Sequence, residues 1–309
     1  MSNGLDTAAS RDRIEILSAD LLSSAADRAN EFRAVARRLE IGLGWHYLLD
    51  LTWAAKEVGP VSGLHIMDAG AGLGVFQWWM ASKGADVVSA DRLNRSHLGR
   101  RFRAWCPVRG LRAGVDLNPL SHPGLRAFLP PRQMQNWSRW PLKIGATVLE
   151  MFEREPVPPK GRGTVTVYNQ DLRSMPDIKT DSIDAIVSIS ALEHNSPEDL
   201  RTVVQALMRV LKPGGKLIAT LGAAKDHDWF HEPSKGWCFT EATLRDLFNL
   251  APGSISNYGR YDELFEKLKE CDVLKNNLAE FYFKSGDNGM PWGKWDPKYQ
   301  PVGVVKVKA

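Results

Sequence analysis

Apolar and polar positions along the chain follow two alternating spacings. Segments with apolar residues at helical intervals, such as 75–83 and 198–211, separate short apolar runs of strand length. Strands joined by crossover helices predict a parallel sheet with both faces covered. The runs that we interpret as strands are 64–69, 85–91, 164–171, 183–190, 215–221 and, near the end of the sequence, 302–308.

Helical spacing also dominates the first part of the sequence. We expect helices throughout residues 10–57, because apolar residues recur at helical intervals in two successive runs there. The glycine- and proline-containing segment 58–63 ends the second run. This pattern predicts a helical N-terminal extension, residues 1–60, followed by a main domain, residues 61–309.

The main domain interrupts its regular alternation once. About 70 residues separate Asp91 from Thr164, and a simple crossover between parallel strands needs far fewer. Proline, arginine and tryptophan are dense in this interval, so we expect residues 93–163 to form an inserted lid or small cap. Further along, we expect a helix at 240–250 and another at 261–282, the latter joining the last two strands.

Composition narrows the class of protein. The 309 residues are 43% hydrophobic and 25% charged, which is typical of globular domains. No apolar run reaches the ~18–20 residues of a membrane helix, and the polar N-terminus has no signal-peptide core. The three cysteines lie far apart, without a CxxC pair or metal-type histidine spacing. We therefore expect a soluble, cytoplasmic protein with reduced thiols.

Charge is distributed unevenly along the chain. The formal net charge is +4, yet residues 92–163 carry 14 Lys and Arg against 4 Asp and Glu. This asymmetry indicates an anionic partner for the middle segment, and a solvated basic face is the alternative explanation.

Residues 67–76, MDAGAGLGVF, place three glycines and an acid directly after an apolar strand and before a helix. A strand, a glycine turn and a helix N-terminus favour a nucleotide site, because the backbone can approach the ligand and offers free N–H groups. Dinucleotide sites use G-x-G-x-x-G. Here the pattern is D-x-G-x-G-x-G, and the acid at Asp68 disfavours a diphosphate and suits a cationic group such as an α-amino group.

Residues 64–221 resemble the class I S-adenosylmethionine-dependent methyltransferases, with several motifs in the family order. The glycine segment is similar to the first motif, Asp91 ends the second strand 17 residues after Gly74, and Asp171 follows the third strand. The resemblance implies an α/β fold with a Rossmann-like, seven-stranded, mostly parallel sheet and helices on both faces. The helical extension and the basic insertion between strands 2 and 3 are added to it.

The resemblance also implies S-adenosylmethionine as methyl donor, with S-adenosylhomocysteine as product. Asp68 and the glycine turn would surround the methionine moiety, and Asp91 would accept hydrogen bonds from both ribose hydroxyls. Asp171 would contact the adenine amino group, with Leu172 against the ring. The residues that we expect to bind the cofactor are Asp68, Gly70, Ala71, Gly72, Gly74, Asp91, Arg92, Asp171, Leu172, Ser188 and Ser190.

The segment after the fourth strand opens onto the methyl group in this family, and it contains Glu193 and His194. We name both as candidate catalytic residues, with His194 as general base or substrate orienter because imidazole titrates near neutrality. A helix cap or a cofactor contact is the alternative role for His194. Some relatives bind a metal through Glu-x-x-Glu-His here. This chain has Ser190 in place of the first Glu, so we expect no metal.

Several further side chains are candidates for binding the acceptor. By resemblance, aromatic residues before the first strand and histidines after the fifth strand face the substrate. The arginines of the insertion suit carboxylate or phosphate groups. The candidates are His46, Tyr47, Arg100, Arg101, Arg103, Trp140, His227 and His231. For the two later histidines a plain surface role is the alternative, and for the aromatic residues a core role.

Three classes of acceptor are compatible with the sequence. The first is a small, anionic, phosphorylated or sugar-linked metabolite methylated on oxygen or nitrogen, with the insertion as lid. The second is RNA, with arginines on phosphates and Trp105, Trp137 or Trp140 stacking on bases. The third is a lipid-linked acceptor at a membrane interface. We favour the small molecule because the chain has no recognisable RNA-binding module, and the pattern does not determine the oligomeric state.

Overall fold

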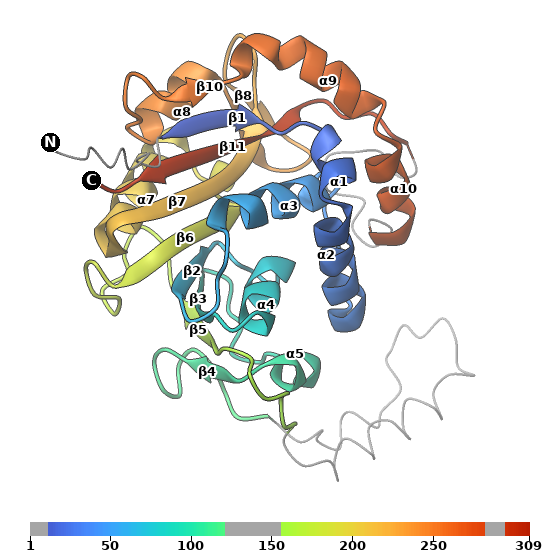
Figure 1. Cartoon of the computed structure of the whole chain (residues 1–309). Helices are drawn as coiled ribbons and strands as arrows, with labels where there is room; N and C mark the ends of the chain where they lie inside the picture. Colours follow the sequence, from blue (N-terminus) through green and yellow to red (C-terminus); the bar gives the residue numbers. More distant parts are fainter. Residues whose placement is uncertain (1–11, 121–155, 282–293) are drawn as a thin grey trace, which may run out of the picture.

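The computed structural model describes residues 12–120, 156–281 and 294–309, apart from the side chains of residues 277–281 (Figure 1). Its described strands form one eleven-stranded sheet, in which nine strands follow the order β10-β1-β11-β7-β6-β2-β3-β5-β4. Helices cover both faces of this sheet. The predicted α/β class with a mostly parallel sheet is confirmed.

Six neighbouring strands of the sheet are parallel to one another, and all of them except residues 108–110 at the edge overlap a predicted strand. These six strands pair in parallel with one another, for example with Asp68 opposite Ser89 and Val187. Since parallel strands start and end together, their carboxyl ends meet at one edge. These strands are β2 (His65–Ala69), β3 (Asp86–Asp91), β4 (Val108–Gly110), β5 (Val165–Asn169), β6 (Ile183–Ile189) and β7 (Leu211–Ala223).

The remaining strands extend the sheet beyond β7. β11 (Gln300–Val307) runs antiparallel between β7 and β1 (Arg13–Ile16), and β10 (Ile255–Ser256) pairs with β1 in parallel. β8 (Trp229–His231) and β9 (Gly236–Phe239) form a hairpin beside the end of β7. The expected count of seven strands is therefore too low for this chain.

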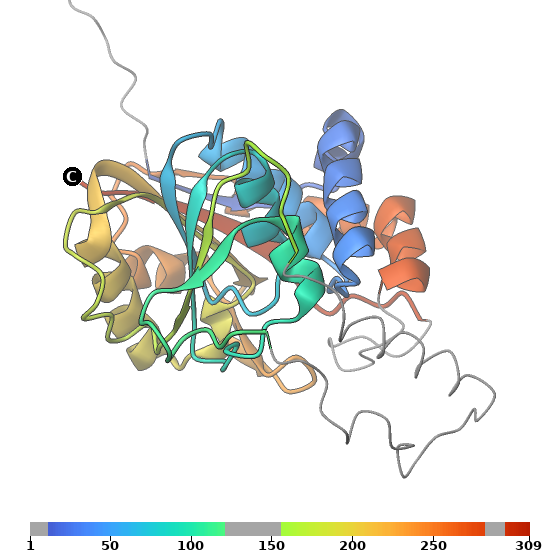
Figure 2. The same ribbon diagram turned by 90° about the horizontal axis from the view of Figure 1, so that it is seen from below.

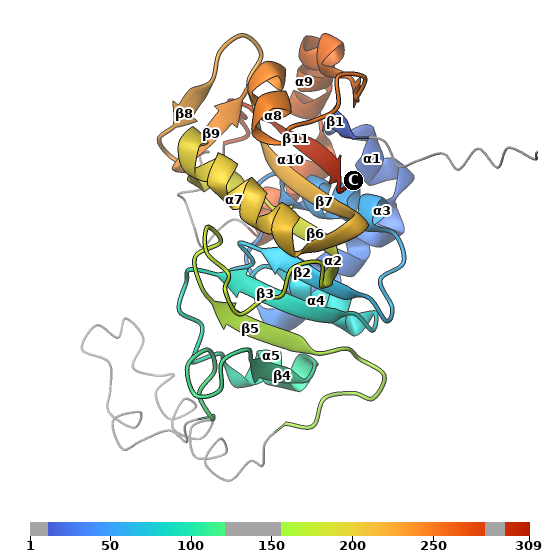
Figure 3. The same cartoon turned by 90° about the vertical axis from the view of Figure 1, so that its left-hand side faces the viewer.

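Two apolar cores lie on opposite faces of the sheet, because successive strand residues point to opposite sides. Ile66 and Val87 pack with Trp53 and Trp78 in one core, and the neighbouring strand residues, such as Met67, belong to the other. The first face carries α1 (Asp20–Ser24), α2 (Ala26–Leu39), α3 (Tyr47–Val58), α4 (Val75–Ser82) and α5 (Arg100–Trp105). The second carries α7 (Pro197–Val210) and α8 (Glu241–Leu247) (Figure 2, Figure 3).

Local sequence explains where the helices of the second face begin. Ser196 accepts a hydrogen bond from the Asp199 amide and precedes Pro197, so that α7 has an N-cap and a proline in its first turn. Thr240 accepts a bond from the Thr243 amide and caps α8, as the sequence predicts. Further helical segments are η3 (Leu192–His194), η4 (Tyr258–Arg260), α9 (Tyr261–Lys269) and α10 (Asp272–Phe281).

Three predictions of secondary structure need correction. Residues 13–16 form β1, because Ile14 and Ile16 alternate with polar residues and the segment pairs with β11. Residues 108–110 lie within the expected insertion but form strand β4 of the sheet. The expected helix 261–282 is divided between α9 and α10 at residues 270–271. Within the described ranges, no helix is long and apolar enough to cross a membrane.

Candidate active site

The carboxyl ends of the parallel strands border a cavity of about 650 Å³. This edge is where open α/β sheets bind ligands, and the volume is typical of small-molecule sites. The walls come from the loop after β2, the ends of β3 and β6, the segment after β5, and residues 40–51. The predicted residues that line the cavity are Asp68, Gly70, Ala71, Gly72, Gly74, Asp91, Arg92, Asp171, Leu172, Ser190, Tyr47, Arg101 and His194.

The loop between β2 and α4 depends on its glycines. Gly70 has a φ of 76° and Gly72 a φ of 47°, both in the left-handed region that favours glycine. A β-carbon on Gly70 would lie 2.5 Å from the β-carbon of Ala191, so a side chain cannot be accommodated without movement of the loop after β6. The Gly72 amide donates to Oδ2 of Asp91 at 2.7 Å. The loop is thereby joined to the end of β3.

Gln77 supports this loop from inside helix α4. Its side-chain amide donates to the carbonyls of Ala71, Gly72 and Gly74 at 3.1–3.3 Å. The Ser89 hydroxyl donates to the Gln77 side-chain oxygen at 2.5 Å. Both side chains are fully buried, and their hydrogen bonds therefore hold the loop in place.

Arg95, in the segment after β3, adds further support to the glycine loop. Its buried guanidinium donates to the Gly72 carbonyl at 3.1 Å, to the Ser89 carbonyl at 2.7 Å and to the Tyr168 carbonyl at 3.2 Å. It also contacts the Ser89 hydroxyl. One cation thus joins the glycine loop to β3 and β5. The planar fork of arginine suits several acceptors at once.

Three charged groups lie together beneath the loop. Burial raises the pKa of Asp68 to about 7, the positive charge of Arg95 opposes this, and the negative charge of Asp91 adds to it. Burial also lowers the pKa of Arg95, while Asp91 and Asp68 raise it. Asp91 itself accepts the amides of Gly72 and Leu93 at 2.7 Å each. The cavity is therefore lined by the carboxyl groups of Asp68 and Asp91, and the buried guanidinium of Arg95 lies close to both.

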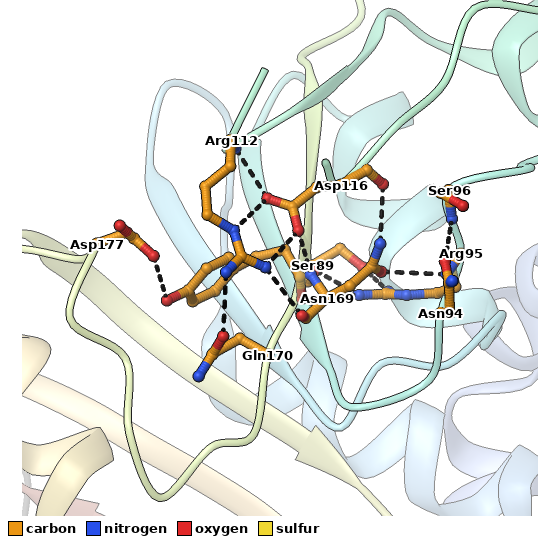
Figure 4. A network of polar contacts seen from close by, with 10 residues as sticks. Ser89, Asn94, Arg95, Ser96, Arg112, Asp116, Asn169, Gln170 and Asp177 are labelled. Carbon is orange, nitrogen blue, oxygen red and sulfur yellow. Dashed lines mark hydrogen bonds and ion pairs between the residues drawn. The ribbon is translucent and has the colours of Figure 1, made fainter. Parts of the chain in front are cut away.

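A polar network fixes the segment that carries Arg95 against β5 (Figure 4). Arg112 donates to Asp116 with both ends of its guanidinium, at 2.7 and 3.1 Å. Asn169 donates to the Asp116 carbonyl at 2.9 Å and accepts the Arg95 amide at 3.2 Å. Arg112 also reaches Gln170 at 3.2 Å. These bonds position the segment, and none of the four side chains named with Arg95 here lines the cavity.

The wall after β5 is more exposed. Asp171 accepts two bonds from the Arg173 guanidinium, at 2.8 and 3.0 Å, and one from the Arg173 amide at 2.9 Å, and these bonds lower the pKa of the carboxyl group. Arg173 also pairs with Asp199 of α7 at 2.8 Å. Leu172 lines the cavity beside them. The segment thus offers an ionised carboxylate next to an apolar side chain.

The opposite wall comes from the N-terminal region. Glu40, at the end of α2, pairs with Arg101 of α5 at 2.7 Å, and both side chains line the cavity. The ring of Tyr47 packs against Gly44, where a β-carbon would lie 2.7 Å from it. Burial raises the pKa of Tyr47. The predicted N-terminal extension therefore supplies part of the cavity wall, although its β1 belongs to the main sheet.

The end of β6 holds the predicted catalytic pair. Ser190 has a φ of 46°, and its hydroxyl donates to Oε1 of Glu193 at 2.6 Å. Glu193 is buried, which raises the pKa of its carboxyl group. Its Oε2 has no hydrogen-bond partner among the described residues. His194 is exposed, and its Nδ1 donates to the Lys235 carbonyl at 2.8 Å.

A smaller cavity of about 40 Å³ adjoins the large one, and both are lined by Tyr47, Ser190 and His194. We call it the inner chamber. By its volume it has room for about three water molecules. The other residues that line the inner chamber are Gly44, Trp45, His46, Glu193, Gly222, Ser234, Gly236, Trp237, Cys238 and Tyr299.

Several predicted site residues lie elsewhere. Ser188 is buried and donates to the Ala69 carbonyl at 2.7 Å, so it does not face the cavity. Arg103 donates to backbone carbonyls of Leu98 and Asn118. Arg100 and the exposed His227 line neither cavity. Trp140 lies outside the described residues.

His231 takes an indirect position. It is buried, its Nδ1 lies 2.7 Å from the Ser234 hydroxyl, and its ring packs edge-on against Tyr299 at 5.1 Å. Burial lowers its pKa. His231 therefore supports Tyr299, which lines the inner chamber, whereas His46 lines the chamber itself.

Several residues that shape the site are not predicted from the sequence. Asp50 lies four residues after His46 on a helix, a spacing that could have identified it. Gln77, Ser89 and Arg95 show no local signal beyond their nearness to the glycine motif. Tyr299 is brought in from near the end of the chain, which no local pattern announces.

Residues 143–219 match a family model described as a methyltransferase domain. The chain contains a methyltransferase domain. The match includes β5, β6 and α7, and it confirms the predicted resemblance, the enzyme class and S-adenosylmethionine as methyl donor. It does not reach the glycine loop, whose role in this methyltransferase is therefore a proposal. No curated protein sequence matches the chain.

Solved structures resemble this methyltransferase only distantly. The cyclase SpnF has a TM-score of 0.45 at 14% identity, with 97% of this chain and 98% of that chain covered. A protein provisionally assigned as a sarcosine dimethylglycine methyltransferase of Galdieria sulphuraria has a TM-score of 0.43 at 16% identity, covering 84% and 85%. Geranyl diphosphate C-methyltransferase of Streptomyces coelicolor A3(2) has a TM-score of 0.42 at 12% identity, covering 84% and 78%.

Proposed function

We propose that this methyltransferase transfers a methyl group from S-adenosylmethionine to a nitrogen or oxygen atom of a small molecule, whose reacting group enters the inner chamber. The observation that carries the proposal is the pair of adjoining cavities, one large and lined by carboxylates near the ends of β2 and β3, and one small and lined partly by aromatic side chains.

The large cavity fits the methyl donor. Its glycine loop lets a ligand approach the backbone, and the buried Asp68 lines the cavity, where its carboxylate would suit an α-amino group. Asp91 uses its two oxygens for amides, yet each carboxylate oxygen has a second lone pair for a ribose hydroxyl. Asp171 and Leu172 offer an acceptor and an apolar surface for an adenine ring. When bound, the donor supplies a methyl group on a sulfonium.

The inner chamber supports a small acceptor. Its volume admits one functional group, and its polar lining includes His46, Glu193 and Ser190. The described residues do not favour an anionic acceptor, because two of the guanidiniums that line the large cavity, Arg101 and Arg173, already pair with carboxylates. The proposal therefore specifies an ionisable N–H or O–H group and no anionic group.

The described residues do not support RNA as the substrate. Trp105, a candidate for base stacking, donates its indole N–H to the Trp78 carbonyl at 2.9 Å, and the Arg162 guanidinium lies 4.0 Å from the centre of its ring. Arg103 is committed to backbone carbonyls. The other two candidate tryptophans lie outside the described residues. We therefore propose no RNA substrate.

Two measurements test the proposed function. Calorimetry should show that S-adenosylhomocysteine binds the wild-type protein and that Asp91→Ala weakens this binding at least tenfold, since charge-assisted hydrogen bonds contribute about 1.5–3 kcal/mol. Unchanged affinity in Asp91→Ala would refute the ribose assignment.

The second measurement concerns the acceptor. Protein incubated with methyl-labelled S-adenosylmethionine should transfer the label into the small-molecule fraction of a cell extract and leave the RNA fraction unlabelled. Labelled RNA, or a protein that fails to bind the donor and its product, would overturn the proposal.

A further inference from the structure

A buried pair of ionisable side chains lies at the wall of the inner chamber. His46 and Asp50 are 4% and 0% exposed, and Nδ1 of His46 lies 2.5 Å from Oδ2 of Asp50. His46 is the N-cap residue of α3 and Asp50 lies in its first turn, so the two stand at positions i and i+4, which face the same side of a helix. Placing such a pair in the interior costs free energy unless hydrogen bonds compensate for the lost water. Neither side chain is needed to hold the donor cavity together.

The hydrogen bonds of the pair indicate which ring nitrogen of His46 carries the proton. Burial raises the pKa of Asp50, and the neighbouring His46 lowers it. When Asp50 is ionised it only accepts hydrogen bonds, so Nδ1 of His46 then carries the proton and Nε2 presents a lone pair. The Tyr299 hydroxyl lies 3.3 Å from this Nε2. Asp50, His46 and Tyr299 thus form a chain whose last two members line the inner chamber.

Further polar groups face His46 from the elements around it. Asp50 and Tyr47 lie on its own helix, Glu193 follows β6, and Tyr299 precedes β11. Oε2 of Glu193 and Oδ1 of Asp50 are buried and have no hydrogen-bond partner among the described residues. Leaving two carboxyl oxygens unsatisfied is costly, and a ligand that brings an N–H or O–H group into the chamber would satisfy the one on Glu193.

We propose that His46 accepts, through the Tyr299 hydroxyl, the proton that the acceptor loses on methylation, and that Asp50 is the positioning residue for His46. This inference rests on the proposed function and extends it, because it requires an acceptor whose N or O atom carries a removable proton. His194 suits this role less well, since its ring is exposed and its Nδ1 is tied to the Lys235 carbonyl.

The acceptor lone pair forms the new bond to the methyl carbon, and the electron pair of the broken carbon–sulfur bond stays on sulfur. The acceptor then has one proton too many. Tyr299 takes that proton on its oxygen and gives its own proton to Nε2 of His46. The resulting imidazolium is stabilised by Asp50 until solvent removes the proton.

His46→Asn tests the role of the imidazole. Its side-chain amide can replace Nδ1 as donor to Asp50 while Nε2 is lost, so folding and donor binding are retained. Loss of a general base lowers rates by about 10²–10⁴-fold, and we expect the rate of label transfer into the small-molecule fraction to fall in that range. His97→Asn is the matched control, because His97 is exposed and lines neither cavity. His194→Asn should lower the rate less than His46→Asn.

Asp50→Asn and Tyr299→Phe test the rest of the chain. Without the Asp50 carboxylate, imidazolium is less stable, so the acidic limb of the rate–pH profile should move to lower pH while the maximal rate falls. A merely structural Asp50 would leave the position of that limb unchanged. Tyr299→Phe should lower kcat by at least tenfold with little change in the affinity for S-adenosylhomocysteine.

The outcomes separate the two proposals. A wild-type protein that neither binds S-adenosylhomocysteine nor transfers label refutes the proposed function. A wild-type protein that transfers label, together with His46→Asn and Tyr299→Phe variants that bind S-adenosylhomocysteine and match its rate at every pH, refutes the role of His46 alone. If Asp50→Asn fails to fold, the rate of the Tyr299→Phe variant still tests the role of His46.

Discussion

The large cavity and the inner chamber share a wall but are built in different ways. Most of the large cavity is formed by short segments that follow β2, β3, β5 and β6, each next to the strand that precedes it. The inner chamber collects residues 44–47, 190–194, 222, 234–238 and 299 from separate parts of the chain. A local sequence motif therefore predicts the large cavity, whereas no local pattern predicts the inner chamber.

Their polar groups also differ in how they are supported. Beneath the glycine loop, Gln77, Ser89 and the two terminal nitrogens of Arg95 bond to one another and to the backbone, whereas Nε of Arg95 has no partner among the described residues. In and beside the inner chamber, Glu193 and Asp50 each keep a buried oxygen without a partner in the described structure. Satisfied groups rigidify a site, and unsatisfied ones favour a ligand that completes them. This difference suits a fixed cradle for the donor and a reactive pocket for the acceptor.

The largest effect should come from filling the cradle. Gly70→Ala places a β-carbon 2.5 Å from that of Ala191 and keeps an unfavourable positive φ, so we expect S-adenosylhomocysteine binding to fall by more than 100-fold in calorimetry. Gly214→Ala is the matched control, because Gly214 has the same positive φ with no atom within 4 Å. It should lose about 1–2 kcal/mol of stability and keep its affinity. Equal affinities in the two variants would contradict the role of the loop.

Arg95→Met should have the next largest effect. It leaves the carbonyls of Gly72, Ser89 and Tyr168 without their shared donor, and each unsatisfied buried group costs about 1–3 kcal/mol. We expect a lower melting temperature and at least a tenfold loss of affinity for S-adenosylhomocysteine. Arg112→Met, in the same network but away from the cavity, should lower stability with little change in affinity. A stable Arg95→Met variant with wild-type affinity would show that the cradle does not depend on this cation.

The ionisation of Asp68 should produce a smaller, pH-dependent effect. Its pKa of about 7 means that the carboxylate becomes charged as pH rises through neutrality, so affinity for a ligand with an α-ammonium group should rise there. Calorimetry between pH 6 and 8, a window of about one unit on either side, should show this rise. Asp68→Asn should abolish it. A pH-independent wild type would contradict the contact.

The same group should influence stability with the opposite sign. The unfolded carboxyl group has a pKa near 3.9, below the folded value of about 7, so the unfolded state loses its proton first. Its contribution to stability is therefore present below about pH 4 and is lost as pH rises toward 7. Thermal unfolding of Asp68→Asn should lack this part of the pH dependence.

The smallest effect should follow from breaking the ion pair at the rim. Glu40 and Arg101 are 68% and 45% exposed, and exposed pairs contribute about 0.2–1 kcal/mol. Glu40→Gln should change donor affinity less than about threefold and stability hardly at all. A larger loss would mean that Glu40 binds the ligand directly, and the wall from the N-terminal region would then belong to the cradle.

The sequence by itself determined the parallel strands, the glycine loop and the acids that end β3 and follow β5. These features arise from apolar periodicity and local motifs, in which neighbouring residues constrain one another. It misjudged residues 13–16, whose strand conformation depends on pairing with β11 about 290 residues later. It also counted Ser188 in the site, because alternation along β6 does not say which face meets the cavity.

Only the tertiary structure decided how the reactive groups combine. It places Tyr299 beside His46, sets Arg95 beneath the glycine loop, and buries the pair of His46 and Asp50 while His194 is exposed. Such contacts join residues that are far apart in the chain, and their energy depends on burial and on exclusion of water. Neither quantity is defined until the sheet and its two layers of helices have closed around them.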